Sequence, residues 1–276
     1  MQQHFGPDGE SAAMSLVPIF NPKPPPAYDL SNIVATNSGT LTDGRGNVHF
    51  TPDGSRLLGF TATKGRWTYA DCSTAWDPST VGSATTVDCT PNEASVTQNS
   101  SGIRFNADGS KVFLTYRGTN EYIEEYALSG AYQGTPTYQA VIDAGFGNAI
   151  DALDFNADGT LLVILQGANF YSYTLSTGFD LSTAGAKSSS LLSVTNAVAF
   201  SFAKNGTRLL VGVNPSGISN DYFSMSTLLT PYDVSTAGTF TDSSTFNGLD
   251  SVQFKSDGKE VFKSFNGLVQ GYTSVG

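Results

Sequence analysis

The chain has 276 residues, a formal net charge of −10 at pH 7 and only 14% charged residues. Because nucleic acids and anionic membrane surfaces are bound by clustered Lys and Arg, this balance argues against both as partners. No apolar run approaches the roughly 20 residues of a membrane-spanning helix, so we expect no membrane insertion. The 29 Gly and the 12% of aromatic residues are typical of short strands joined by tight turns.

Residues 1–27 carry no repeated pattern. They lack the basic stretch and apolar run of a secretory signal peptide. We therefore expect the chain to be made in a cytoplasm and to carry no signal peptide. The stretch 20–27 holds four prolines and cannot be helical, because proline lacks the amide hydrogen and restricts the backbone. We predict an extended arm over 1–27, which is either a disordered tail or an anchor to a partner. The anchoring candidates are Phe20, Pro22, Pro24, Pro25 and Pro26.

One pattern recurs five times between residues 48 and 262. A hydrophobic residue, a variable residue and a Phe precede a link ending in Asp-Gly or Asn-Gly, and a second apolar run follows. The alternation of apolar and variable residues predicts a short strand, and the Gly predicts a tight turn with positive φ. In the fourth copy we place a one-residue insertion before Asn205-Gly206. The leading residues are 55, 50, 45 and 54 residues apart: Phe50, Phe105, Phe155, Phe200 and Phe254.

A second motif, Tyr-x-Leu/Val-Ser, closes a third strand in several units, at 126–129, 173–176 and 232–235. In the first unit, 72–77 aligns with 175–180, which places Cys72 in an apolar packing position. Weaker strands follow at 86–89, 138–142 and 189–194. Four strands per unit at a period near 50 residues indicate a radial array of blades.

The two ends of the chain fit together in this scheme. Leu30 precedes Phe50 by 20 residues, just as Val234 precedes Phe254, so the chain begins within a blade and ends after a third strand. Pairing the ends would remove an exposed sheet edge. We therefore predict an all-β fold over 28–276: a five-bladed β-propeller of four-stranded blades, closed by an N-terminal strand that completes the C-terminal blade.

The sequence predicts no metal site and no cofactor. Turn geometry explains the aspartates of the repeats, and no calcium-loop pattern occurs. The two cysteines, Cys72 and Cys89, lack zinc-ligand spacing. They could form a disulfide within one blade or remain buried and reduced, and we favour the second because a cytoplasm keeps thiols reduced.

Catalytic residues are hard to assemble from this sequence, and we predict none. Five-bladed propellers do include glycosidases, which need carboxylates that converge at the channel. The candidates lie near the starts of the innermost strands: Asp43, Asp151, Asp154 and Asp250. Arg104 and Asp154 occupy the same repeat position in adjacent blades, so we favour a structural ion pair between them.

A binding surface is easier to support. The loops joining second and third strands share one face of a propeller, and here they combine amides, two arginines and aromatic rings. Neutral polar groups beside exposed rings suit sugars, although each ring could instead pack between blades. The predicted ligand-binding residues are Arg66, Trp67, Tyr116, Arg117, Asn169, Phe170, Asn220, Asp221, Phe265 and Asn266.

With both repeats taken together, the chain resembles repeat-containing structural proteins of bacteriophages. Their units look like hydrophobic-x-Phe-x-x-Asp-Gly followed by Tyr-x-Leu-Ser-Thr-x-Phe-Asp-hydrophobic-Ser-Thr-Ala, and residues 173–184 carry the second half. The resemblance covers about 28–276, with a degenerate Tyr motif in the first two units. It implies a virion-associated propeller on tail or capsid, and it carries over no catalytic residue.

These expectations combine into one hypothesis. The chain is a phage structural protein, held on the particle by other virion proteins through its arm, which binds a host-surface polysaccharide or serves as decoration. The alternatives are a cellular lectin-like or protein-interaction propeller and a glycoside hydrolase.

Overall fold

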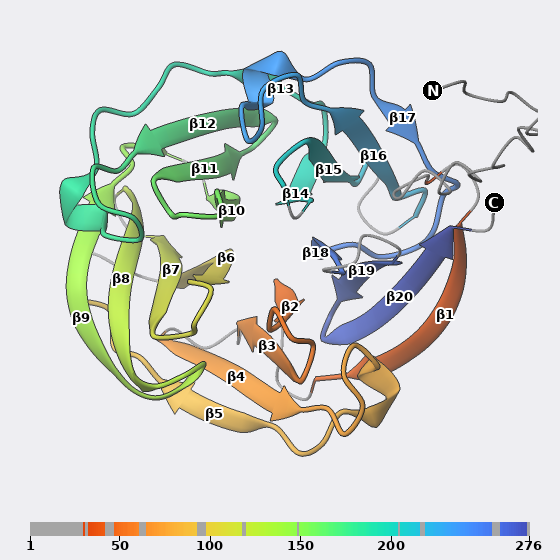
Figure 1. Cartoon of the computed structure of the whole chain (residues 1–276), viewed down its shortest axis with the longest axis horizontal. Coiled ribbons are helices and arrows are strands. Elements are labelled where there is room, and N and C mark those ends of the chain that lie inside the picture. The colour runs from red at the N-terminus through yellow and green to blue at the C-terminus, as the bar shows by residue number, and fades with distance from the viewer. Residues whose placement is uncertain are drawn as a thin grey trace, which may run out of the picture.

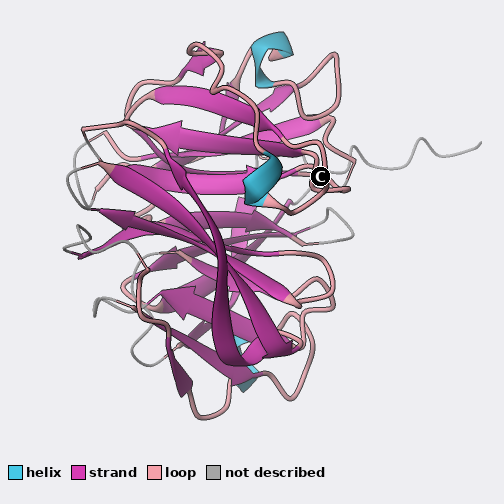
Figure 2. Ribbon diagram, turned by 90° about the vertical axis from the view of Figure 1, so that its left-hand side faces the viewer, coloured by secondary structure: helices cyan, strands magenta, loops and turns pink. Residues whose placement is uncertain are grey.

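The computed structural model describes residues 30, 33–41, 47–60, 65–92, 98–117, 120–147, 149–203, 205–215, 219–255 and 260–274. Within them, five sheets of four antiparallel strands surround a central axis, which confirms the predicted five-bladed propeller (Figure 1). Seen from the side, the strands cross from one face of the ring to the other (Figure 2). The predicted arm, with its anchoring candidates, lies outside the described residues.

Each blade is named here by its order in the chain, and its strands run from the channel outward. Blade 1 holds β2 (Val48–Phe50), β3 (Arg56–Phe60), β4 (Arg66–Asp71) and β5 (Thr85–Asp88). Blade 2 holds β6 (Gln98–Phe105), β7 (Lys111–Arg117), β8 (Glu121–Gly130) and β9 (Gln133–Asp143). Blade 3 holds β10 (Ile150–Phe155), β11 (Leu161–Gln166), β12 (Asn169–Thr174) and β13 (Leu192–Ser193). Blade 4 holds β14 (Ala197–Phe202), β15 (Arg208–Val213), β16 (Tyr222–Thr227) and β17 (Thr241–Asp242). Blade 5 holds β18 (Ser251–Phe254), β19 (Glu260–Phe265), β20 (Leu268–Ser274) and β1 (Ile33–Thr40).

The closure of the ring is as predicted. Strand β1 pairs antiparallel with β20, from Ile33 opposite Ser274 to Thr40 opposite Leu268. The Thr36 hydroxyl donates to Glu260 Oε1 at 2.9 Å within blade 5, and the Asn37 amide donates to Asp77 Oδ1 of blade 1 at 3.2 Å. The N-terminal strand therefore completes blade 5 and also holds it against blade 1.

An aromatic residue covers the Asp-Gly or Asn-Gly turn of each of blades 1–4. It comes from the segment after the third strand and has a positive φ of 55–63°: Trp76, Tyr132, Phe179 and Tyr232. The turn glycine also has a positive φ, and it leaves room for the ring. At Gly159, an added Cβ would lie 2.2 Å from the Phe179 ring. These turns therefore need Gly for both conformation and space.

The structure corrects the predicted register of the fourth repeat. Phe202 pairs with Leu209, as Phe155 pairs with Leu162, and Phe202 packs on Tyr232 with ring centroids 5.2 Å apart. Counted back from the Asn205-Gly206 turn, Phe202 is thus the repeat phenylalanine, and there is no insertion. The error arose because Phe200 and Phe202 alternate, so the hydrophobic pattern fits either residue.

The Asp-x-Ser-Thr part of the second motif forms three short 3₁₀ helices, η1 (Pro78–Thr80), η2 (Leu181–Thr183) and η3 (Val234–Thr236). Asp77, Asp180 and Asp233 are their N-caps, and each carboxylate accepts a backbone amide hydrogen bond at 3.0 Å. The cap satisfies amides that a helix start leaves unpaired. No helix among the described residues is long and apolar enough to cross a membrane.

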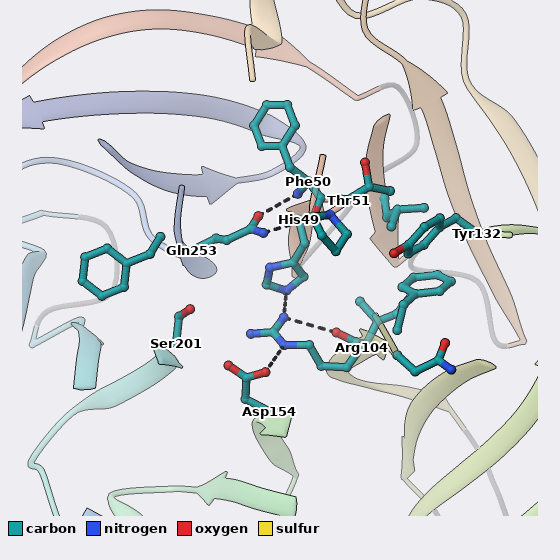
Figure 3. A pocket seen from close by; sticks show the side chains of 14 residues that line it. His49, Phe50, Thr51, Arg104, Tyr132, Asp154, Ser201 and Gln253 are labelled. Carbon is teal, nitrogen blue, oxygen red and sulfur yellow. Dashed lines mark hydrogen bonds and ion pairs between the residues drawn. The ribbon is translucent and has the colours of Figure 1, made fainter. Parts of the chain in front are cut away.

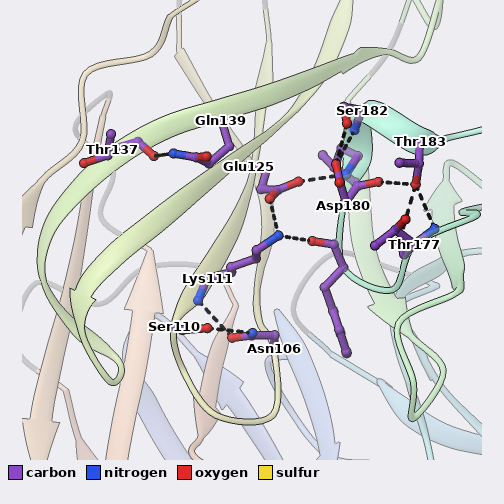
Figure 4. A network of polar contacts seen from close by, with 12 residues as sticks. Asn106, Ser110, Lys111, Glu125, Thr137, Gln139, Thr177, Asp180, Ser182 and Thr183 are labelled. Atoms are coloured by element: carbon purple, nitrogen blue, oxygen red, sulfur yellow. Dashed lines mark hydrogen bonds and ion pairs between the residues drawn. The ribbon is translucent and has the colours of Figure 1, made fainter.

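Adjacent blades are joined by buried polar contacts as well as apolar packing. Glu125 of β8, 1% exposed, accepts from Lys111 Nζ at 2.6 Å and from the Leu181 amide of blade 3 at 2.7 Å (Figure 4). Lys111 Nζ also donates to the Phe179 carbonyl at 2.7 Å. One ion pair thus fixes the η2 segment of blade 3 against blade 2.

Both cysteines are free and buried. The backbone of Cys72 forms an isolated β-bridge with Val81 in blade 1, just as the backbone of Leu175 does with Ala184 in blade 3. Cys72 therefore occupies the predicted packing position. Burial raises the pKa of Cys72 to about 11 and that of Cys89 to about 12, so both stay protonated at neutral pH.

Candidate functional site

One side chain from each blade points into the central channel. It is the variable residue before the repeat phenylalanine. Successive side chains of a strand point to opposite faces of the sheet, so this side chain and the phenylalanine side chain point in opposite directions. The five residues, called here the channel ring, are His49, Arg104, Asp154, Ser201 and Gln253 (Figure 3). They line a cavity of about 200 Å³, and its walls include Phe105, Tyr132 and Phe254.

The cavity, called here the cup, lies at one end of the channel in the described part of the chain. The residues two positions earlier on the innermost strands are small and buried: Asn47 (2% exposed), Ala152 (3%), Ala199 (1%) and Ser251 (1%). The Asn47 amide donates to the Asp151 carbonyl at 3.2 Å, which links blade 1 to blade 3 across the axis. The lining residues Thr51, Pro52 and Asn106 belong to the turns between first and second strands. The cup therefore opens on the face that carries the Asp-Gly turns.

The predicted ion pair between blades 2 and 3 is confirmed. Arg104 Nε donates to Asp154 Oδ1 at 3.1 Å, and the two side chains are only 12% and 20% exposed. Asp154 also accepts the Phe155 amide at 3.0 Å and the Phe202 amide of blade 4 at 3.3 Å. The carboxylate thus joins blades 2, 3 and 4.

Arg104 also contacts His49 of blade 1, through Nη1 and the ring nitrogen Nε2. A guanidinium has only donors, so Nε2 accepts and the ring proton is on Nδ1. Burial, and then the Arg104 charge, lower the pKa of His49 well below 6.5. His49 is therefore neutral at pH 7, which this contact requires.

This depressed pKa makes an acid-sensitive contribution to stability. In the unfolded chain His49 takes up a proton near pH 6.5, whereas in the folded chain it does not, so stability falls as the pH drops below about 6.5. Each pH unit below about 6.5 over which folded His49 stays neutral lowers the stability by up to about 1.4 kcal/mol. Urea unfolding of His49→Gln should show that much less acid destabilisation than the wild type. His4→Gln is the matched control, and a profile of His49→Gln that matched it would contradict this role of His49.

Gln253 completes the polar ring between blades 5 and 1. Its Oε1 accepts the Phe50 amide at 2.6 Å and its Nε2 donates to the Phe50 carbonyl at 3.0 Å. Ser201 has the smallest side chain of the ring, and its hydroxyl makes a long contact of 3.4 Å to the Phe202 carbonyl. The cup is therefore least filled beside Ser201.

The remaining carboxylate candidates have structural roles. Asp151 Oδ2 accepts the Gly167 amide at 2.7 Å and Asp250 Oδ2 accepts the Asn266 amide at 2.8 Å, so each closes the next hairpin of its blade. Burial raises the pKa of Asp250, and it raises the pKa of Asp151 to about 6. Asp43 lies outside the described residues. Among the described residues, no group of three or more His, Cys, Asp or Glu is placed to share a metal ion.

Four of the ten predicted ligand-binding residues are fully buried in the structure. Trp67, Tyr116 and Phe170 are 0% exposed and pack between blades, for example Trp67 against Phe105 at 5.2 Å. They sit inside strands or at their starts, so they form core and offer no ring face to a sugar, which corrects that part of the prediction. Asp221 is also 0% exposed, and burial raises its pKa.

The other predicted residues lie on the face opposite the cup. Arg66 pairs with Asp88 at 2.5 Å, Asn169 accepts from Ser190 at 3.3 Å, and Phe265 is half-buried. Asn220 and Asn266 are exposed turn residues with positive φ, a conformation that Asn tolerates. The Arg117 side chain is outside the described part of the structure. None of the ten predicted residues lines the cup.

Sequence reasoning missed the channel ring as a site. The available signal was that the middle position of the hydrophobic-x-Phe motif carries a polar residue in every blade once Phe202 is taken as the fourth phenylalanine.

Fold and site together define the chain as a five-bladed β-propeller with a polar cup at one end of its channel. No protein-family model matches the chain, and no curated protein is significantly similar to it. A chain in the crystal structure of a nidogen/laminin complex is similar at 12% identity and a TM-score of 0.50, over 76% of this chain and 70% of that chain.

Two further solved structures match with slightly lower TM-scores. Hydrazine synthase from Kuenenia stuttgartiensis matches at 12% identity and a TM-score of 0.49, over 81% of this chain and 56% of that one. A putative 6-phosphogluconolactonase from Bacteroides fragilis matches at 14% identity and a TM-score of 0.48, over 83% and 69%. At these identities the likeness concerns the fold alone.

Proposed function

We propose that the chain is a bacteriophage virion protein whose propeller binds a host-surface glycan in the cup. The observation that carries the binding function is the diversity of the channel ring. At the next position all five blades have the same residue, Phe50, Phe105, Phe155, Phe202 and Phe254, whereas the ring has five different polar residues. A purely architectural position would repeat like its neighbour. Convergent, unlike polar groups in a partly aromatic cavity are typical of a ligand site.

Binding fits the cup better than hydrolysis does. A glycosidase needs two carboxyl groups free to act on either side of the bond. Asp154 is held by Arg104 and two backbone amides, and Asp151 and Asp250 each accept a hairpin amide. The aromatic wall formed by Phe105 and Tyr132, with ring centroids 5.6 Å apart, suits the apolar face of a sugar.

The virion part of the proposal is supported by the resemblance of the repeats to phage structural proteins. The Asp-x-Ser-Thr part of that pattern recurs as the capped helices η1, η2 and η3. The arm over 1–27, through Phe20 and the prolines Pro22, Pro24, Pro25 and Pro26, would bind other virion proteins. The propeller would then stand on the tail or capsid with its cup accessible.

A truncation tests this division of labour. A chain lacking residues 1–27 should keep its melting temperature and its glycan binding, because β1 and the channel ring are retained. It should lose attachment to particles, measured by co-sedimentation with virions or by immunogold labelling. Undiminished attachment would contradict the anchor, and absence of the full-length chain from all particles would favour a cellular lectin-like propeller.

A further inference from the structure

We propose that the cup recognises the carboxylate of an acidic sugar, such as a uronic acid, through His49 and Ser201. This inference rests on the proposed glycan binding and names the class of sugar. It follows from which hydrogen-bonding groups of the channel ring are already used and which remain for a ligand.

The Asp154, Gln253 and His49 acceptors of the ring each already receive at least one donor. The oxygens of Asp154 receive three donors, from Arg104 Nε, the Phe155 amide and the Phe202 amide. Gln253 Oε1 receives the Phe50 amide, and His49 Nε2 faces Arg104. A ligand group that can only donate hydrogen bonds would therefore find few partners in the cup.

The remaining capacity of the ring consists mainly of donors. His49 is 7% exposed, and the proton on its Nδ1 follows from the contact of Nε2 with Arg104. In Figure 3 the free edge of the His49 ring is turned toward the open space between Gln253 and Ser201. The Ser201 hydroxyl borders the same space, and it donates to the Phe202 carbonyl over a long 3.4 Å, a weak bond that a ligand acceptor can replace. A ligand group rich in acceptors fits there, and the two oxygens of a carboxylate can take both donors.

Charge within the cup agrees with an acid of single charge. Arg104 and Asp154 neutralise each other, so the empty ring carries no net charge beside neutral His49. These are the charged side chains that contact or adjoin the ring of His49. A carboxylate adds one negative charge, whereas a phosphate monoester, which carries up to two, would suffer greater repulsion from Asp154.

The test uses matched pairs of probes with the full-length chain. Oligosaccharides of glucuronate, galacturonate, mannuronate and guluronate are titrated calorimetrically, each beside its carboxyl-reduced neutral counterpart. We expect at least one uronate to bind at least tenfold more tightly than its counterpart. Equal or tighter binding of the neutral sugars would overturn this inference and leave the proposed glycan binding standing. Binding of none of the eight would overturn both.

Two variants assign the binding to the cup. Ser201→Val and His49→Gln should each weaken uronate binding about tenfold or more, while Ser176→Val, an exposed serine outside the cup, should leave it unchanged. Melting curves confirm that each variant is folded. Uronate binding that all three variants retain would place the site elsewhere and overturn the assignment.

Discussion

A chain with Gly39 replaced by valine should be about 3 kcal/mol less stable than the wild type, because the closing strand would be pushed off blade 1. A Cβ at position 39 would lie 1.6 Å from the Pro78 carbonyl oxygen and 2.3 Å from its carbon, which are backbone atoms of η1. Relief requires β1 or η1 to move, and either movement strains the Asn37–Asp77 contact. Urea unfolding followed by tryptophan fluorescence measures the loss.

Gly147→Val is the matched control for this substitution. Gly147 is exposed, and an added Cβ there meets no atom within 4 Å. Its stability should stay within about 0.5 kcal/mol of the wild type. Equal stability of Gly39→Val and Gly147→Val would contradict the closure of the ring by β1 against blade 1.

Replacing Arg104 by leucine should lower the free energy of unfolding by about 2–3 kcal/mol and abolish ligand binding. The substitution leaves the Asp154 carboxylate, 20% exposed, without its cation and His49 Nε2 without its donor. Removing one partner of a largely buried ion pair leaves the other charge buried and unpaired, so the loss of stability is large. Chemical denaturation measures the stability, and calorimetry measures the binding.

Arg66→Leu removes the same side chain from an exposed pair. Arg66 and Asp88 are 48% and 73% exposed, so solvent screens their attraction and the loss should be below about 1 kcal/mol. Arg66→Leu should also bind ligand normally, because Arg66 does not line the cup. Equal losses of stability and of ligand binding in the two variants would contradict the structural role given to Arg104 in the channel ring.

The architecture was predictable because its causes are local and repeated. Each blade is specified by three local patterns: the Asp-Gly turn, the alternating strand before it and the Asp-x-Ser-Thr cap. Repetition of these patterns along the chain specifies the ring of blades. The closure followed from the matching positions of Leu30 and Val234. The Arg104–Asp154 pair followed because equivalent positions in adjacent blades must face one another.

The face proposed to bind ligand was not predictable from the same patterns. Trp67 and Tyr116 stand next to polar loops in the sequence, but blade packing on both sides removes them from solvent. The channel ring depends on five segments about 50 residues apart that meet only in the folded ring. The register of Phe200 and Phe202 hid its fourth member, Ser201, because only strand pairing distinguishes the two phenylalanines.

Probing an array of bacterial surface polysaccharides with the full-length chain, beside its Ser201→Val and Ser176→Val variants, is the decisive experiment. The cup described here predicts that the wild type and Ser176→Val bind the same subset of glycans and that Ser201→Val loses them. Binding of no glycan by the wild type, or equal binding by all three chains, would contradict a glycan site in the cup.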